Sequence, residues 1–197
     1  MNSWDERYRH ARYFYGRTPN YFVAEQLQLL EPGRGLYLAE GEGRNAVFAA
    51  GLGHRVTAVD TSVEGRRKAL ELAGDRGVQI IYGVADLLDH SWSGEQWNHI
   101  VMCYAHMQPE AMPEVHRRVA AALADGGTLI HISFSKAQHG RGTGGPPDLA
   151  RLHDLGELRE QYAGVELDYA VEREVDLVEA DGHSGVAAII ELVGTKV

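Results

Sequence analysis

The sequence predicts an α/β protein with a mostly parallel, seven-stranded sheet that ends in an antiparallel C-terminal hairpin. Three observations carry this prediction. Short β-rich runs alternate with helical runs, which is the pattern of a parallel sheet with crossover helices. A glycine-rich loop joins the first of the predicted strands to a helix. Near the C-terminus, two long β-like segments flank a turn at residues 179–182.

The predicted elements have recognisable start and stop signals. A short, aromatic-rich helix or arm covers residues 3–11, and Asn20 is a suitable N-cap for a helix over 21–30. Ser62 caps a further helix that runs to Gly74. The five parallel strands are expected over 35–39, 55–60, 78–82, 99–104 and 128–134, and two more helices over 44–52 and 109–124.

The segment after the fifth strand has a different composition. Residues 135–147 are rich in glycine and proline, and glycine hinges over 136–147 suit a lid that closes over a site. A helix over 154–162 follows, and the hairpin strands are expected over 165–177 and 185–195. His183 falls in the hairpin turn, where we expect an exposed side chain near the edge of the sheet.

Length and composition indicate one globular domain over residues 1–197. Hydrophobic residues make up 44% of the chain and charged residues 24%, which is ordinary for a protein with its own core. The net charge of −9 disfavours nucleic acid as a partner, because affinity for phosphates depends on Lys and Arg. A single cysteine, Cys103, a polar N-terminus and no apolar run of roughly 20 residues predict a cytoplasmic protein without a membrane span. We expect a monomer or a homodimer.

The loop Glu40-Gly41-Glu42-Gly43-Arg44-Asn45 follows a predicted strand and opens a helix. Glycines there let the backbone turn tightly and approach a ligand, and the free amides at the helix start face it. Asp60 ends the next strand, where a carboxylate can accept hydrogen bonds from both ribose hydroxyls. Because Gly41-x-Gly43-x-x-Ala46 also matches the dinucleotide fingerprint, the loop alone leaves both NAD and S-adenosylmethionine (SAM) open.

Three further features favour SAM over NAD. Asp86 follows the third strand, where a carboxylate can accept the adenine amino group. The segment 123–130, with Gly126-Gly127, resembles the entry to the fifth strand of methyltransferases. The chain also leaves little sequence for the substrate domain that a dehydrogenase needs. An NAD-binding oxidoreductase remains the alternative.

Several motifs together resemble a bacterial branch of class I SAM-dependent methyltransferases, the TehB-like or thiopurine-methyltransferase-like proteins. They are residues 38–47, 58–62, 143–146 and His183-x-Gly185. The resemblance implies a three-layer Rossmann-like fold, SAM as cofactor, S-adenosylhomocysteine as product, methyl transfer to a small molecule, and an N-terminal arm, residues 1–20, over the cofactor. It also implies a cofactor site lined by Glu40, Gly41, Gly43, Asn45, Asp60, Thr61, Ala85 and Asp86.

Neighbouring residues complete the expected cofactor site. These are Glu42, Arg44, Ser62, Leu87, Tyr104 after the fourth strand, and Tyr15 in the arm, for which a core role is the alternative. Ala39 stands where the class usually has an acidic residue, and Asn45 replaces the usual third glycine. We therefore expect Arg44 or the arm to help hold the methionine end of SAM. A SAM-binding regulatory protein without turnover is a further alternative.

His106, just after the fourth strand, is the candidate catalytic residue. It is placed to act as a base or to contact SAM, and a loop histidine bonded to backbone is the alternative. A base is needed only if the acceptor carries a proton. Thiol, amine, hydroxyl and metalloid acceptors all remain open. The ten histidines show no metal-binding spacing, so we expect no metal site.

Overall fold

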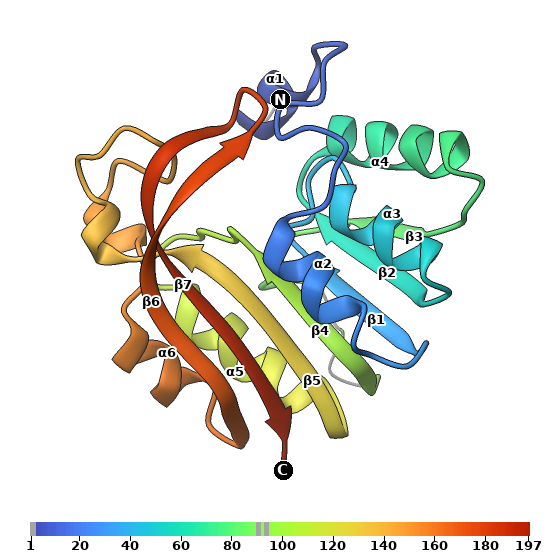
Figure 1. Cartoon of the computed structure of the whole chain (residues 1–197). Helices are drawn as coiled ribbons and strands as arrows, with labels where there is room; N and C mark the ends of the chain where they lie inside the picture. Colours follow the sequence, from blue (N-terminus) through green and yellow to red (C-terminus); the bar gives the residue numbers. More distant parts are fainter. Residues whose placement is uncertain (1–2, 90–91, 93–94) are drawn as a thin grey trace.

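The computed structural model describes residues 3–89, 92 and 95–197, and its centre is one seven-stranded sheet (Figure 1). The strand order is β3-β2-β1-β4-β5-β7-β6, with β1 to β5 parallel and β7 antiparallel to both of its neighbours. The predicted fold class is therefore confirmed. The strands are β1 Arg34–Leu38, β2 Arg55–Asp60, β3 Ile81–Val84, β4 Trp97–Cys103, β5 Leu123–Phe134, β6 Val165–Glu179 and β7 His183–Lys196.

Helices cover both faces of the sheet and make a three-layer structure. They are α1 Ser3–Tyr8, α2 Tyr21–Leu27, α3 Arg44–Gly51, α4 Val63–Asp75, α5 Met112–Ala122 and α6 Leu155–Gln161, with short 3-10 turns at Lys136–Gln138 and Leu149–Arg151. Successive β1 side chains alternate between the layers. Leu36 and Leu38 pack with α5 and α6, whereas Tyr37 packs with α2 and α3. Within the described part of the chain, no helix has the length and hydropathy to cross a bilayer.

Side-chain caps fix the predicted helix starts. The Asn20 carboxamide oxygen accepts the backbone N–H groups of Phe22 (3.1 Å) and Val23 (3.3 Å) at the start of α2. The Ser62 hydroxyl accepts the Gly65 N–H (2.9 Å) at the start of α4. Each cap satisfies donors that would otherwise lack a partner in the first helical turn. Both predicted caps are confirmed, although α2 ends at Leu27 rather than at residue 30.

Several predicted boundaries are wrong, among them the start of the fifth strand, which begins at Leu123 rather than at residue 128. The third strand begins at Ile81 rather than at residue 78, because the Val78 N–H still bonds to a carbonyl of α4, Ala73 O, at 3.0 Å. Parallel pairing with β2 starts at Thr57 opposite Ile81. The hairpin strands are longer than predicted, so the turn is shortened to residues 180–182.

Figure 1 shows that the N-terminal arm and the tip of the β6–β7 hairpin meet at one end of the molecule. The Asp181 N–H donates to Phe14 O (3.1 Å), and Arg12 pairs with the Asp181 carboxylate at 3.2 Å. This end carries the carboxyl termini of the parallel strands, where ligands bind in open α/β sheets. The fold thus brings residues from both ends of the chain to one edge.

The close packing of α3 against α4 requires a glycine at position 43. Its φ is +85°, and an added Cβ would lie 2.5 Å from Ala69 Cβ on α4. We expect Gly43→Ala to lower the free energy of unfolding in urea by about 1–3 kcal/mol, through backbone strain and overpacking. Gly51→Ala is the matched control, because its added Cβ meets nothing within 4 Å. An equal effect of both substitutions would contradict the packing argument.

Candidate functional site

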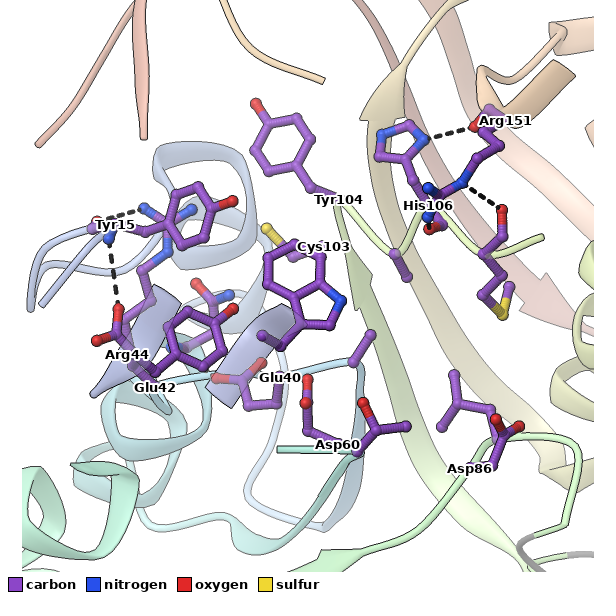
Figure 2. A pocket seen from close by; sticks show the side chains of 18 of the residues that line it. Tyr15, Glu40, Glu42, Arg44, Asp60, Asp86, Cys103, Tyr104, His106 and Arg151 are labelled. Atoms are coloured by element: carbon purple, nitrogen blue, oxygen red, sulfur yellow. Dashed lines mark hydrogen bonds between the residues drawn. The ribbon is translucent and has the colours of Figure 1, made fainter. Parts of the chain in front are cut away.

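A cavity of about 300 Å³ lies at the carboxyl edge of the sheet. Its walls come from the arm, from the loops after β1, β3 and β4, from the end of β2, and from the hairpin. Figure 2 shows Tyr15, Arg44 and Glu42 on one side of the site and His106 with Arg151 on the other. The size falls at the lower end of small-molecule sites.

The glycine loop is wound tightly at the floor of this cavity. Ala39, Gly41 and Gly43 have positive φ values of 52°, 59° and 85°. Gly41 lies directly beneath the arm, since an added Cβ would be 2.7 Å from the Tyr8 hydroxyl. The glycines therefore serve two purposes, the turn itself and the close approach of the arm.

Two buried carboxylates hold the loop in this shape. Glu40 Oε1 accepts the N–H groups of Asn45 (2.9 Å) and Ala46 (2.7 Å) and so caps α3. Asp60 accepts the N–H groups of Gly41 and Ser62, each at 2.9 Å. Burial raises the pKa of Glu40 to about 7 and also raises the pKa of Asp60. Both carboxyl groups line the cavity and are already oriented by backbone amides.

Glu42 fastens the N-terminal arm to the loop. Its Oε2 accepts the Phe14 N–H at 2.7 Å, and its Oε1 pairs with the buried ammonium of Lys68 on α4. The same ammonium donates to the carbonyl oxygens of His10 (2.9 Å) and Arg12 (2.5 Å). One buried ion pair therefore joins the glycine loop, α4 and the arm.

Glu179 joins the hairpin to the same region. Arg44 Nη2 lies 3.1 Å from Glu179 Oε2, and Asn20 donates to Oε1 at 2.8 Å. His183 Nδ1 lies 2.6 Å from Oε2. Burial alone would raise the pKa of Glu179, but the His183 hydrogen bond and the Arg44 charge outweigh it and lower the pKa to about 2. The expectation of an exposed His183 is wrong: this residue starts β7, is 4% exposed, and lines the cavity.

Both ring nitrogens of His106 are engaged by the backbone. Nε2 accepts the Phe134 N–H at 3.2 Å, so Nδ1 carries the proton and donates to Arg151 O at 2.9 Å. Burial lowers the pKa of His106 to about 4. The ring is therefore neutral and fully hydrogen-bonded, which matches the alternative of a loop histidine bonded to backbone.

The chain is similar to known proteins in part of its sequence and in its fold. Residues 36–127 match the family model described as a methyltransferase domain. The match covers just under half of the chain, from β1 into β5. No curated protein matches the sequence significantly.

Solved structures share the fold of the whole chain. A structure concerning conversion of a disulfide bond into a thioacetal group during echinomycin biosynthesis matches at TM-score 0.78 and 20% identity, over 98% of this chain and 89% of the other. TehB from Haemophilus influenzae matches at TM-score 0.72 and 18% identity, over 89% of this chain and 61% of the other. The N-methyltransferase NodS from Bradyrhizobium japonicum WM9 was solved in complex with S-adenosylhomocysteine. It matches at TM-score 0.66 and 16% identity, over 88% of this chain and 85% of the other. The likeness is that of the class I methyltransferase fold.

The strand order also separates this methyltransferase fold from an NAD domain. Dinucleotide-binding domains have the parallel order 3-2-1-4-5-6. Here an antiparallel β7 lies between β5 and β6. The glycine-loop fingerprint occurs in both methyltransferase and dinucleotide-binding folds, whereas an antiparallel strand inserted at this position occurs only in the methyltransferase fold.

Most residues predicted for the methyltransferase site line the cavity. They are Tyr15, Glu40, Glu42, Arg44, Asn45, Asp60, Thr61, Asp86, Leu87, Tyr104 and His106. Within the described chain, Gly41, Gly43, Ser62 and Ala85 do not line it. Ser62 is fully buried and donates its hydroxyl proton to Asp5, at 2.6 Å. Asp86 is exposed, and its Oδ1 accepts the Leu88 N–H at 2.8 Å.

Sequence reasoning missed several residues of the cavity wall, among them two from the arm and two from distant segments. Trp4 and Tyr8 come from the arm, whose aromatic content was a signal, while Arg151 and His183 come from segments far along the chain. The Arg151 guanidinium donates to the carbonyl oxygens of His106 (2.7 Å) and Met107 (3.2 Å). No local pattern in the sequence shows that these segments reach the site.

The glycine-rich loop does not cover the cavity. Gln138 ties it to β7 by accepting the Ala188 N–H at 2.8 Å and donating to Thr143 at 2.8 Å. Of the residues that the structure describes, none in 136–147 lines the cavity. The structure gives the lid hypothesis no support, since the loop packs against Phe134 and His183 instead.

Most histidines of the described chain are packed into its interior. The rings of His116 and His131 are 5.7 Å apart, and each lies within 5.5 Å of the His153 ring. Across the described chain, no group of three or more His, Cys, Asp or Glu side chains is arranged to hold a metal ion.

Removing Lys68 should release the arm. In Lys68→Met the buried Glu42 carboxylate loses its counter-charge, and we expect the free energy of unfolding in urea to fall by about 3–5 kcal/mol. The double variant Glu42→Gln/Lys68→Met should lose less, because no charge is left unpaired. Lys136→Met is the control, since its pair with Glu157 is exposed and contributes at most about 1 kcal/mol. Equal losses in both single Lys variants would refute the assignment.

Glu40 should make stability depend on pH. Its pKa rises from 4.5 to about 7 in the folded protein, so its contribution is fully present below pH 4.5 and is lost as the pH rises through 7. Between pH 5 and pH 8, we expect the free energy of unfolding in urea to fall more in the wild type than in Glu40→Gln, which keeps the cap acceptor. Parallel pH profiles for the two proteins would contradict this.

Proposed function

We propose that the protein transfers the methyl group of SAM to a small-molecule nucleophile inside the cavity. The observation that carries the proposal is the Asp60 carboxylate at the end of β2, held by two backbone amides at the cavity floor. A carboxylate oriented in this way accepts ribose hydroxyls without reorganisation, and each such bond contributes about 1.5–3 kcal/mol. Asp86, with Oδ1 engaged by Leu88, is assigned to the adenine amino group.

The methionine end of SAM is assigned to Glu40 and the arm. Glu40 Oε1 caps α3, and Oε2 receives no hydrogen bond from the described residues. An ammonium group at Oε2 would lower the raised pKa of this carboxyl and keep it ionised. This assignment supplies the acidic group that Ala39 lacks. Arg44 is already neutralised by Glu179, so it acts mainly by holding the hairpin.

Size and charge support a small acceptor. The cavity of about 300 Å³ must hold cofactor and acceptor together, and the arm residues Trp4 and Tyr8 wall it. The net charge of −9 disfavours nucleic acid. The similar structures are described by different chemistries, thioacetal formation and N-methylation among them, so their likeness does not select an acceptor. The single cysteine supports a reducing, cytoplasmic setting for a one-domain enzyme.

Binding of S-adenosylhomocysteine, measured by calorimetry, tests the proposal. We expect the wild type to bind it and Asp60→Ala to bind about 10-fold more weakly or worse, through loss of the ribose hydrogen bonds. Asp125→Ala is the control, since this exposed residue belongs to β5 at the opposite edge of the sheet.

The same titration with NADH separates the alternatives. Binding of NADH without binding of S-adenosylhomocysteine would overturn the proposal. Binding of S-adenosylhomocysteine without turnover of SAM against thiol, amine, halide and tellurite or selenite acceptors would favour a regulatory protein.

A further inference from the structure

A carboxylate and an imidazole form a paired unit in the cavity wall. Glu179 Oε2 lies 2.6 Å from His183 Nδ1, and the side chains are only 9% and 5% exposed. The His183 ring packs against the rings of Tyr15 (4.8 Å), Tyr104 (4.6 Å) and Phe134 (4.9 Å). These contacts fix the ring on several sides while it lines the cavity.

The pairing determines which ring nitrogen is free. Because Glu179 is ionised, His183 Nδ1 must be the donor, and a neutral imidazole then has an unprotonated Nε2. No described residue forms a hydrogen bond with Nε2. Carboxylate, Nδ1–H and free Nε2 are the arrangement by which enzymes orient a histidine base.

Of the other titratable groups of the cavity wall, Glu40 and Asp60 are assigned to the cofactor, and the groups around His183 are less suited to accept a proton. Both nitrogens of His106 are occupied. Burial raises the pKa of the Cys103 thiol to about 12 and raises the pKa of the Tyr104 phenol, so both keep their protons. The groups that face His183 are Glu179, Tyr15 and Tyr104. Beyond Glu179 lies the Arg44 guanidinium, which shares that carboxylate.

We propose that His183 is the general base of this enzyme and that the acceptor is a protic nucleophile, a thiol, hydroxyl or amine. The inference rests on the proposed function. The acceptor atom forms a bond to the methyl carbon, and the carbon–sulfur bond breaks with its electron pair passing to sulfur, giving S-adenosylhomocysteine. The acceptor proton moves to His183 Nε2, and Glu179 stabilises the resulting imidazolium. Solvent later removes the proton.

The test compares His183→Ala with the wild type as full chains. SAM turnover is followed with 2-mercaptoethanol, phenol and ethanolamine as protic probes and with iodide as a probe that carries no proton. We expect the variant to lose about 100-fold or more in kcat/KM for the protic probes and to lose the acidic limb of their pH profile, where protonation of the base lowers the rate. Turnover of iodide should fall far less than turnover of the protic probes, because iodide has no proton to lose, and added imidazole should restore turnover of the protic probes. His139→Ala is the control, because His139 is exposed and outside the cavity wall.

Calorimetry with S-adenosylhomocysteine separates the two proposals. If the wild type does not bind it, the proposed function fails. If both proteins bind it equally and the variant keeps its rate and pH profile, the role of His183 is overturned. Turnover of iodide alone by the wild type overturns the protic acceptor.

A spectroscopic measurement keeps the test independent of the probes. In nitrogen NMR spectra of the S-adenosylhomocysteine complex above pH 8, His183 should carry its proton on Nδ1. A proton on Nε2 would overturn the inference even if no probe is turned over.

Discussion

One carboxylate, Glu179, holds the functional end of the molecule together. It receives the guanidinium of Arg44 from α3, the amide of Asn20 at the start of α2, and the imidazole of His183 from β7. All three donors are buried, so the carboxylate is desolvated, and the His183 hydrogen bond and the Arg44 charge keep it ionised. Removing any partner leaves a buried charge under-compensated, which couples the hairpin, two helices and the cavity wall.

Acidic side chains shape this site before any ligand arrives. Glu40, Glu42 and Asp60 each accept backbone N–H groups, from α3, the arm and the glycine loop respectively. These bonds set the loop geometry at no cost during binding, which is the condition for strong electrostatic preorganisation. The loop at the cavity floor is thus held mainly by backbone amide donors and carboxylate acceptors, while Arg44 and Lys68 are engaged in ion pairs.

The sequence predicts the central strands well because their signals are local. β2 is found at Arg55–Asp60 as predicted, since a tight turn precedes it and a helix cap follows it. The prediction fails where tertiary contacts decide. β3 starts late because α4 keeps hydrogen-bonding past its last turn. His183 is buried because the hairpin extends to meet an arm more than 160 residues earlier in the chain, and no local pattern encodes that distance.

The arm and hairpin also set the order in which the protein becomes functional during synthesis. Residues 34–103 contain β1 to β4 and can pair with one another as they emerge. The cavity wall, however, joins Tyr15 to His183, and β7 inserts beside β5 only after β6 has been made. Such distant contacts carry the largest loop-closure entropy and form last. A nascent chain therefore carries the glycine loop and Asp60 well before it has the hairpin that completes the cavity wall.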